Sequence, residues 1–112
     1  MREARRGDVW TIGGGPGGDS NKPRPAIIIR SDSFENPESI TMIPLTTVPL
    51  ESPTRVHIGS DEATGIANDS YAMTDKIHTY KRSALGTYCG RLTAEQLVEV
   101  ERALLLYLGI AG

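Results

Sequence analysis

The chain has 112 residues, of which 38% are hydrophobic and 23% are charged. This length predicts one domain over residues 1–112, and this balance excludes both a disordered polyelectrolyte and a membrane protein. The apolar runs are too short to cross a bilayer, and no export signal follows the N-terminal arginines. The single cysteine, Cys89, excludes an internal disulfide and a multi-cysteine zinc site. We therefore expect a soluble, cytoplasmic protein with no bound metal.

The net charge of -2 is unevenly distributed along the chain. An acidic excess taken over the whole protein argues against nonspecific binding to nucleic acid. Residues 1–30, however, carry six basic and three acidic side chains, and residues 76–94 carry four basic and no acidic ones. If the fold brings these two basic blocks together, an acidic protein acquires a basic face.

Short strands follow one another from the N-terminus. Asp8–Ile12 predicts the first strand, and Gly13–Pro23 is too rich in glycine and proline for regular structure. The β-branched run Ala26–Arg30 predicts a buried strand. Ile40–Thr47 predicts another, in which Pro44 favours an edge position or a bulge because proline cannot donate a ladder hydrogen bond.

Further short strands complete the set. They are predicted at Thr54–Ile58, Ser70–Met73, Ile77–Thr79 and Thr87–Arg91. Strands this short and closely spaced predict a mostly β or α+β fold, arranged as a compact barrel or sandwich. The sequence contains no strand–helix–strand repeat that would favour a parallel sheet.

The last segment changes to helical periodicity. Thr93 and Gln96 match a capping box, in which each side chain bonds to the backbone N–H of the other residue. An apolar stripe at helical spacing follows, made of Leu97, Val100, Leu104 and Leu108. Gly109 is placed to end this helix, which we expect to cover the barrel.

The glycine-rich loop has the spacing of a dinucleotide site. Gly13, Gly15 and Gly18 match G-x-G-x-x-G after a strand. A dinucleotide-binding turn must open a helix, however, and Pro16 and Pro23 prevent one here. We therefore expect no cofactor, and instead a mobile loop over a neighbouring site.

Arg24 lies between two prolines at the mouth of the Ala26–Arg30 strand. The prolines restrict the backbone on both sides and so hold the guanidinium ready for bidentate recognition of a phosphate or carboxylate. The alternative, equally compatible with the local pattern, is an arginine that pairs with an acidic neighbour.

Two further side-chain types suit phosphate chemistry. Thr46 and Thr47 place hydroxyls at the end of a strand, where they either hold a turn or, beside an arginine, bind a phosphate oxygen. His78 has acidic and basic neighbours in the sequence and can exchange a proton near neutral pH. A solvated histidine without such a role is the commoner case.

Six short motifs occur in order over nearly the whole chain. They are Arg6–Trp10, a glycine-containing loop, Arg24–Ile29, Ile43–Thr47, Asp75–Thr79 and Gly90–Thr93. This series resembles the MazF/PemK-type toxins of bacterial toxin–antitoxin pairs. The resemblance implies an SH3-like β-barrel with a C-terminal helix, a homodimer, and metal-independent cleavage of single-stranded RNA by an mRNA interferase. It also implies a MazE-like antitoxin whose acidic C-terminal segment competes with RNA for basic groups.

Carried over residue by residue, the resemblance assigns the catalytic arginine to Arg24 and the catalytic threonine to Thr46. It places Asp19 in the first loop where the family has an acidic residue, and it sets His78 at a position that is usually basic. Either His78 or Asp19 is therefore expected to move a proton, and the sequence leaves open which one does.

Metal-free cleavage of RNA uses the 2′-hydroxyl as nucleophile and leaves a 2′,3′-cyclic phosphate and a 5′-hydroxyl. The protein must supply in-line geometry, positive charge on the phosphorane oxygens and proton transfer. Arg24 suits the second task because a fixed, protonated guanidinium matches two phosphate oxygens. Thr46 is expected to hold another oxygen.

Single-stranded RNA must be held by cations and by rings that stack on its bases. Tyr80, beside Lys81 and Arg82 in the second basic block, is the expected stacking ring. The expected RNA-binding residues are Lys22, Thr47, Asp75, Lys76, Tyr80, Lys81 and Arg82. Asp75 keeps the acidic position of its motif, but Met73 stands where some family members have an arginine.

Two alternatives from other classes stay open. A gyrase-poisoning toxin similar to CcdB has the same fold but acts through C-terminal residues that include a tryptophan, and this chain ends Leu108–Gly112 without one. A relative that binds RNA without cutting it is compatible with the departures at Met73 and His78.

Overall fold

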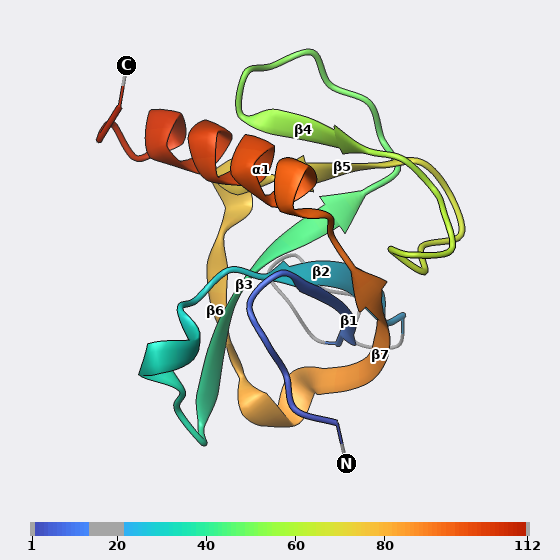
Figure 1. Cartoon of the computed structure of the whole chain (residues 1–112), viewed down its shortest axis with the longest axis vertical. Coiled ribbons are helices and arrows are strands. Elements are labelled where there is room, and N and C mark those ends of the chain that lie inside the picture. The colour runs from blue at the N-terminus through green and yellow to red at the C-terminus, as the bar shows by residue number, and fades with distance from the viewer. Residues whose placement is uncertain (1, 14–21, 112) are drawn as a thin grey trace.

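The computed structural model describes residues 2–13 and 22–111, which form an antiparallel sheet of seven strands and a C-terminal helix (Figure 1). The strands are β1 (Asp8–Ile12), β2 (Arg24–Ile28), β3 (Ser39–Thr46), β4 (Arg55–Ile58), β5 (Ser70–Met73), β6 (His78–Lys81) and β7 (Leu85–Arg91). The helix is α1 (Ala94–Tyr107), and the short 3-10 helices are η1 (Asp32–Phe34), η2 (Thr74–Lys76) and η3 (Arg82–Ala84).

The strands expected from the sequence are all present, and their bounds differ from the expected ones by no more than two residues. β2 shows the clearest shift. It begins at Arg24 rather than Ala26, because the ladder with β1 extends to a pair between Ile12 and Arg24. Arg24 is therefore part of the sheet and not of the loop before it.

β3 is the central strand of the sheet. In the order β4-β5-β3-β2-β1-β7 it pairs along one edge with β2, and its other edge is shared by β6 and β5. The first half of the strand, Ser39–Met42, pairs with β6, and Leu45 and Thr46 pair with β5. One strand thus connects both parts of the sheet.

Pro44 lies within this central strand, so the expectation of an edge position is wrong. Ile29 N–H donates to Thr41 C=O, which means that odd-numbered residues of β3 bond to β2 and that Pro44 turns its nitrogen to the other edge. On that edge it falls between the pairs made with β6 and those made with β5. The missing N–H therefore costs no ladder bond.

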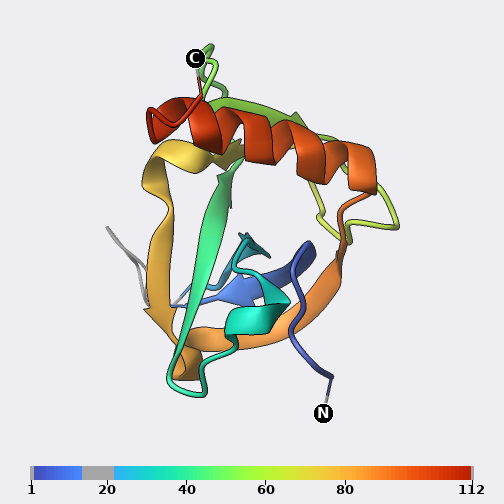
Figure 2. The same ribbon diagram turned by 60° about the vertical axis from the view of Figure 1, so that its left-hand side comes forward.

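The sheet is curled but not closed. Among the described residues the two end strands, β4 and β7, share no ladder, so the expected SH3-like barrel is an open one. α1 lies across one end of the curled sheet (Figure 2). The structure therefore confirms a mostly β fold with a C-terminal helix, and the word barrel describes it approximately.

Alternation along the strands gives each face of the sheet its own core. Ile27 and Ile43 belong to the core that packs under α1. Ala26, Ile28 and Met42 belong to a second core on the opposite face. Because successive residues of a strand point to opposite faces, this pattern also decides where the polar ends of β2 and β3 emerge.

α1 begins and ends where the sequence predicts. Thr93 Oγ1 accepts from Gln96 N–H at 3.1 Å, and Gln96 Oε1 accepts from Thr93 N–H at 2.8 Å. Gly109, with a φ of 74°, follows the last turn. The buried stripe is shorter than expected, since Val100 is buried but Leu108 is 50% exposed. In the part of the chain that is described, no helix is both long and apolar enough to cross a membrane.

Two glycines allow the segment between β4 and β5 to lie against β7. A Cβ on Gly65 would stand 1.9 Å from the carbonyl oxygen of Cys89, and one on Gly90 would stand 2.2 Å from that of Ala63. Arg91 N–H donates to Ala63 C=O at 2.7 Å at the same contact. Any larger residue at either glycine would force the two backbones apart.

Candidate active site

Arg24 and Thr46 lie on the same face and at the same end of neighbouring strands. β2 and β3 pair Ala26 with Pro44, and this register continued by two residues sets Arg24 opposite Thr46. The ladder itself ends at Ala26 and Pro44. Beyond it the Arg24 side chain is exposed and Thr46 is half-buried. The two residues to which the resemblance assigned catalysis thus follow the end of the β2–β3 ladder on the same face.

The same cross-strand row continues on both sides of this pair. Ile12 of β1 pairs with Arg24, Tyr71 of β5 pairs with Thr46, and His57 of β4 pairs with Tyr71. Directly opposite residues in an antiparallel ladder project on the same face. One face therefore carries, in order, Ile12, Arg24, Thr46, Tyr71 and His57, which we call the Arg24 row.

Thr46 is held by a turn bond. Its Oγ1 accepts a hydrogen bond from Val48 N–H at 3.2 Å. This is one of the two roles that the sequence allowed, and it leaves the hydroxyl proton available for donation. Thr47, the next residue, is exposed. Thr46 therefore offers an oriented hydroxyl at the end of β3.

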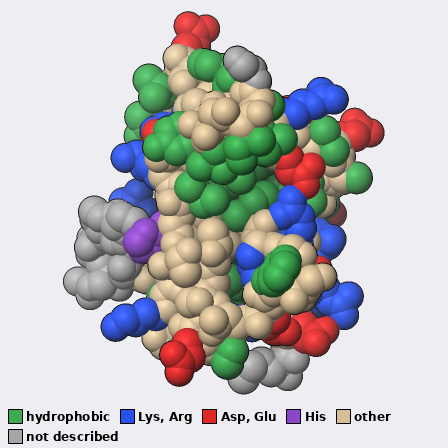
Figure 3. Space-filling view, turned by 90° about the vertical axis from the view of Figure 1, so that its left-hand side faces the viewer, with side chains coloured by type: hydrophobic (Ala, Val, Ile, Leu, Met, Phe, Trp, Pro, Cys, Tyr) green, Lys and Arg blue, Asp and Glu red, His purple; other side chains and the backbone are tan. Residues whose placement is uncertain are grey.

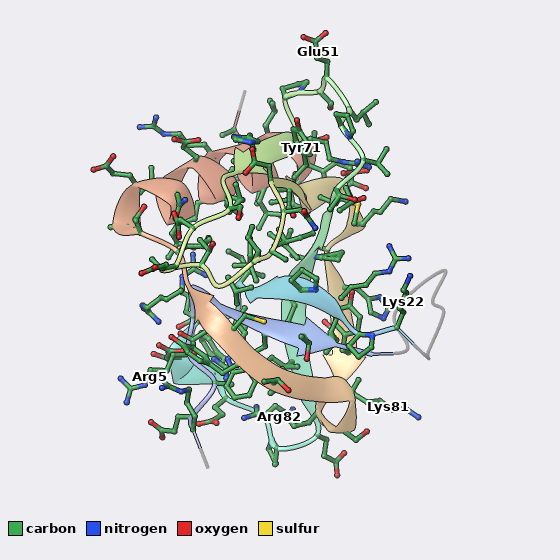
Figure 4. All side chains as sticks on the ribbon, turned by 90° about the vertical axis from the view of Figure 1, so that its right-hand side faces the viewer. Arg5, Lys22, Glu51, Tyr71, Lys81 and Arg82 are labelled. Carbon is green, nitrogen blue, oxygen red and sulfur yellow. The ribbon has the colours of Figure 1, made fainter. Side chains whose placement is uncertain are left out.

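Several cations on and beyond the row are not neutralised by the described part of the chain. Within residues 2–13 and 22–111, no carboxylate pairs with Lys22, Arg24, Lys76 or Lys81. Lys22 lies beside the start of β2, and Lys81 lies farther down the same side of the molecule (Figure 4). The alternative interpretation of Arg24, in which it pairs with an acidic neighbour, thus has no support among these residues.

The two basic blocks adjoin, because β1 pairs with both β2 and β7. They do not make a uniformly basic face, because many of their arginines pair with carboxylates: Arg5 with Glu3, Arg6 with Glu101, Arg30 with Asp32, Arg82 with Glu35 and Arg91 with Asp8. Arg2 lies over the Tyr88 ring, 3.9 Å from its centroid. The basic blocks therefore contribute a few separate cations rather than a continuous basic face.

His78 lies in a different cross-strand row. It pairs with Met42, four residues before Thr46, which is about 13 Å along an extended strand. Its ring packs edge-on against Tyr80, with centroids 4.7 Å apart. The structure thus places His78 on the face of the Arg24 row but not beside Thr46. Asp19, the other residue expected to move a proton, lies outside the described residues.

Tyr80 is not a surface ring. Its side chain is 4% exposed and packs in the core that contains Met42 and Ile28. Burial also raises the pKa of its hydroxyl. The expectation of an exposed stacking ring at Tyr80 is wrong, because its ladder partner Ile40 directs it to the inner side of β6.

Lys81 and Arg82 lie at the other end of β3 from Thr46. Lys81 pairs with Ser39, the first residue of the strand. The Arg82 side chain is 27% exposed, and its guanidinium lies 3.5 Å from the Glu35 carboxylate. The structure therefore separates these two residues from the Arg24 row, and their contact with RNA stays a prediction.

Asp75 is held by an arginine from a neighbouring strand. Arg55 donates from Nε to Oδ1 at 2.7 Å and from a terminal nitrogen to Oδ2 at 3.1 Å. This bidentate contact lowers the pKa of Asp75. Arg55 is the ladder partner of Met73, two residues before Asp75. Both carboxylate oxygens thus fix η2, which carries Lys76.

Three residues of this region have no functional role in the sequence interpretation: Arg55, His57 and Tyr71. His57 alternates with two apolar residues, Val56 and Ile58, and its side chain faces outward. No local pattern showed that β4 and β5 pair with each other and with the end of β3. That pairing alone brings Tyr71 and His57 into the Arg24 row.

The Arg24 row offers hydrogen-bond donors to an anion. Arg24 presents a forked guanidinium and Thr46 an oriented hydroxyl, and such donors stabilise negative charge that develops on a phosphorus centre. Among the described residues, no group of three or more His, Cys, Asp or Glu side chains is arranged to hold a metal ion.

Known proteins are similar to this chain over nearly its whole length. Residues 5–108 match a family described as PemK-like, MazF-like toxin of type II toxin–antitoxin system. A "Probable endoribonuclease MazF" of Mycolicibacterium smegmatis is 42% identical over 109 residues, covering 96% of this chain and 99% of the relative. The "Endoribonuclease MazF9" of Mycobacterium tuberculosis is 28% identical over 115 residues, covering 95% and 97%.

Solved structures share the fold. An "Endoribonuclease in complex with its cognate antitoxin from Mycobacterial species" superposes with a TM-score of 0.80 at 22% identity, covering 98% of this chain and 99% of that one. A MazF crystal structure from Deinococcus radiodurans superposes with a TM-score of 0.78 at 17% identity, covering 97% and 99%. At these identities the likeness concerns the fold alone.

Acid should weaken the contact between Arg55 and Asp75. Because the folded pKa of Asp75 is lowered, its stabilising contribution is complete above the ordinary pKa of an aspartate and is lost as the pH falls through the lowered value. We expect Asp75→Asn to reduce the free energy of unfolding by about 2 kcal/mol at pH 6. The difference from the wild type should narrow toward pH 3, as measured by urea denaturation.

Glu62→Gln is the matched control, because Glu62 is exposed and forms no ion pair with the described residues. It should follow the wild type at every pH. A gap between the wild type and Asp75→Asn that stays constant from pH 6 to pH 3 would contradict the stabilising role of the ionised Asp75.

Proposed function

The chain belongs to the PemK-like, MazF-like toxin family of type II toxin–antitoxin systems, and on this basis we propose that it is a metal-independent endoribonuclease that cuts single-stranded RNA at specific sequences. The observation that carries the proposal is the placement of Arg24 and Thr46 on one face at the same end of β2 and β3. The endoribonuclease names of two relatives that span nearly the whole chain support it.

In the proposed reaction the 2′-hydroxyl of RNA attacks the adjacent phosphorus, and the bond to the 5′-oxygen of the next nucleotide breaks. The products are a 2′,3′-cyclic phosphate and a 5′-hydroxyl. Arg24 binds two oxygens of the phosphorane and neutralises their charge, because its guanidinium stays protonated throughout. Thr46 donates its hydroxyl proton to a non-bridging oxygen.

Proton transfer is assigned to His78 or Asp19. The 2′-hydroxyl must lose a proton and the departing 5′-oxygen must gain one, so one general base and one acid are required. His78 can reach the substrate only if the RNA extends from the Arg24 row toward Met42, since the two rows are about 13 Å apart along β3. Lys22, Thr47 and Lys76 supply contacts near Thr46, with Lys81 and Arg82 at the far end of the strand.

The function is tested by incubating the purified protein with a long RNA in EDTA and identifying the ends. We expect discrete cuts with 5′-hydroxyl and cyclic phosphate termini. A 2′-deoxy nucleotide at the cut position should abolish cleavage, because the nucleophile is missing. Binding without cuts would favour the inactive RNA-binding relative, and inhibition of gyrase would favour the toxin similar to CcdB.

Arg24→Ala should lower the cleavage rate about 100- to 1,000-fold, because one preorganised donor to the phosphorane is lost. Arg24→Lys should recover only part of the rate, since an ammonium cannot bind two oxygens in a fork. Arg102→Ala, on the exposed side of α1, is the matched control and should cut normally. A folded Arg24→Ala protein with the wild-type rate would remove Arg24 from the mechanism.

The proposed partners follow from the same surface. An antitoxin of the MazE type would place an acidic segment against Lys22 and Arg24 and so exclude the RNA phosphates. A solved relative with the same fold is in complex with its cognate antitoxin. We propose that toxin and antitoxin meet in the cytoplasm, where messenger RNA is available.

We also propose a homodimer formed through the opposite face of the sheet. A groove of about 510 Å³ lies between α1 and the sheet and is lined by Ile29, Ile77, Leu104 and Leu105. Figure 3 shows hydrophobic side chains gathered in one patch on this side of the molecule. Leu105 and Leu108 are 38% and 50% exposed, so a partner that covers them gains apolar burial.

Leu105→Glu should convert the dimer to a monomer, because it places a charge in the apolar contact. The molar mass from light scattering after size-exclusion chromatography measures this. Val98→Glu is the control, since Val98 is 42% exposed on the same helix but lies away from the groove. Equal masses for the wild type and Leu105→Glu would place the dimer contact elsewhere.

A further inference from the structure

We propose that Tyr71 and His57 form a stacking site for the unpaired RNA base that flanks the phosphate held by Arg24 and Thr46. This inference rests on the proposed endoribonuclease function and names a specificity-determining part of its substrate site. It comes from the ladder pairs between β3, β5 and β4, which place both rings in the Arg24 row.

Tyr71 is the direct neighbour of the proposed phosphate site. It is the ladder partner of Thr46, so the two side chains project from adjacent strands on the same face. Figure 4 shows Tyr71 in the upper part of the view, where β4 and β5 lie, with Lys22 at the start of β2. A nucleotide whose phosphate contacts Arg24 and Thr46 therefore has its base within reach of the Tyr71 ring.

His57 extends this ring surface by one strand. Thr74 N–H donates to Thr54 C=O, which makes these two residues a hydrogen-bonded pair of the β4–β5 ladder. Hydrogen-bonded and non-hydrogen-bonded pairs alternate along an antiparallel ladder, so Tyr71 and His57 form a non-hydrogen-bonded pair, in which the side chains approach closely. Their ring centroids are 5.5 Å apart, with the planes tilted by 57°. The tilt lets a base stack on one ring while its edge meets the polar atoms of the other.

The rings are both accessible and oriented. The His57 side chain is 55% exposed, and its Nε2 lies 3.5 Å from Asp69 Oδ2. Asp69 is itself fixed, since its Oδ1 accepts from Ser60 N–H at 2.7 Å. Tyr71 is half-buried against its neighbours, so its ring keeps one position while a face remains open. Preorganised rings lose little freedom when a base binds.

The other aromatic side chains are unsuited to this task. Tyr80 and Trp10 are 4% and 7% exposed and belong to the core. Tyr88 packs edge-on against Trp10 and is covered by Arg2 on its face. Phe34 lies in η1 and Tyr107 lies in α1, neither of which belongs to the Arg24 row. Among the aromatic side chains of the described residues, Tyr71 is thus the one that lies next to Thr46.

The test measures stacking directly. The protein is titrated with a short RNA of the sequence it cuts, made uncleavable by a 2′-deoxy nucleotide and carrying the fluorescent base 2-aminopurine in turn on either side of the cut position. We expect the emission to be quenched on binding at one of these positions. Tyr71→Ala should abolish the quenching and weaken binding roughly 5- to 100-fold, whereas Tyr71→Phe should retain both.

A second comparison uses cleavage of natural RNA. Tyr71→Ala should lower kcat/KM on intact RNA, and the difference from the wild type should vanish on RNA that lacks the flanking base. His57→Ala should reduce the same quantity less strongly. Tyr107→Ala is the matched control, because Tyr107 is 48% exposed on α1 and should behave as the wild type.

The outcomes separate this inference from the proposed function. A wild-type protein that cuts RNA while folded Tyr71→Ala cuts and binds equally well would overturn the stacking site and leave the nuclease intact. Equal losses on intact and base-lacking RNA would also overturn it, since they indicate a general structural role. A wild-type protein that neither binds nor cuts RNA would overturn both.

Discussion

The register of β3 is the constraint on which the rest of the site depends. This strand pairs with β2 along one edge and with β6 and β5 along the other, so it fixes which residues of four strands share a face. Ile43 and Leu45 are buried under α1, which makes a slip of one residue costly because it would turn them away from this core to the opposite face. The same constraint turns Thr46 to the opposite face, next to Arg24 and Tyr71.

The two faces of the sheet therefore carry different kinds of side chain. The face that carries the Arg24 row has a cation, an oriented hydroxyl and a pair of rings, which together suit one nucleotide. The other face is covered in part by α1 and leaves an apolar groove beside Ile29 and Leu105. Because neighbouring residues of one strand lie on opposite faces, the proposed catalytic residues and the proposed dimer contact can be altered independently.

Charge pairing decides which basic residues remain available to a ligand. Five arginines of the basic blocks are engaged by carboxylates, and Arg55 is engaged by Asp75. In each of the pairs with Asp8 and Asp75 one partner is well covered, Asp8 in the first and Arg55 in the second, and we expect these pairs to act mainly by fixing β7 and η2. A net charge therefore says little about the RNA-binding surface, which depends on the few cations that the fold leaves without such partners.

The sequence by itself determined the strands and the capped helix, because period-two alternation and capping residues are local properties, and its short motifs drew attention to Arg24 and Thr46. Tertiary structure decided the rest. It buried Tyr80, placed Pro44 in a central strand, brought Arg55 to Asp75 and set Tyr71 beside Thr46. These outcomes depend on which strands pair and in what register, and that choice is made by burial of two cores across the whole chain rather than by any single segment.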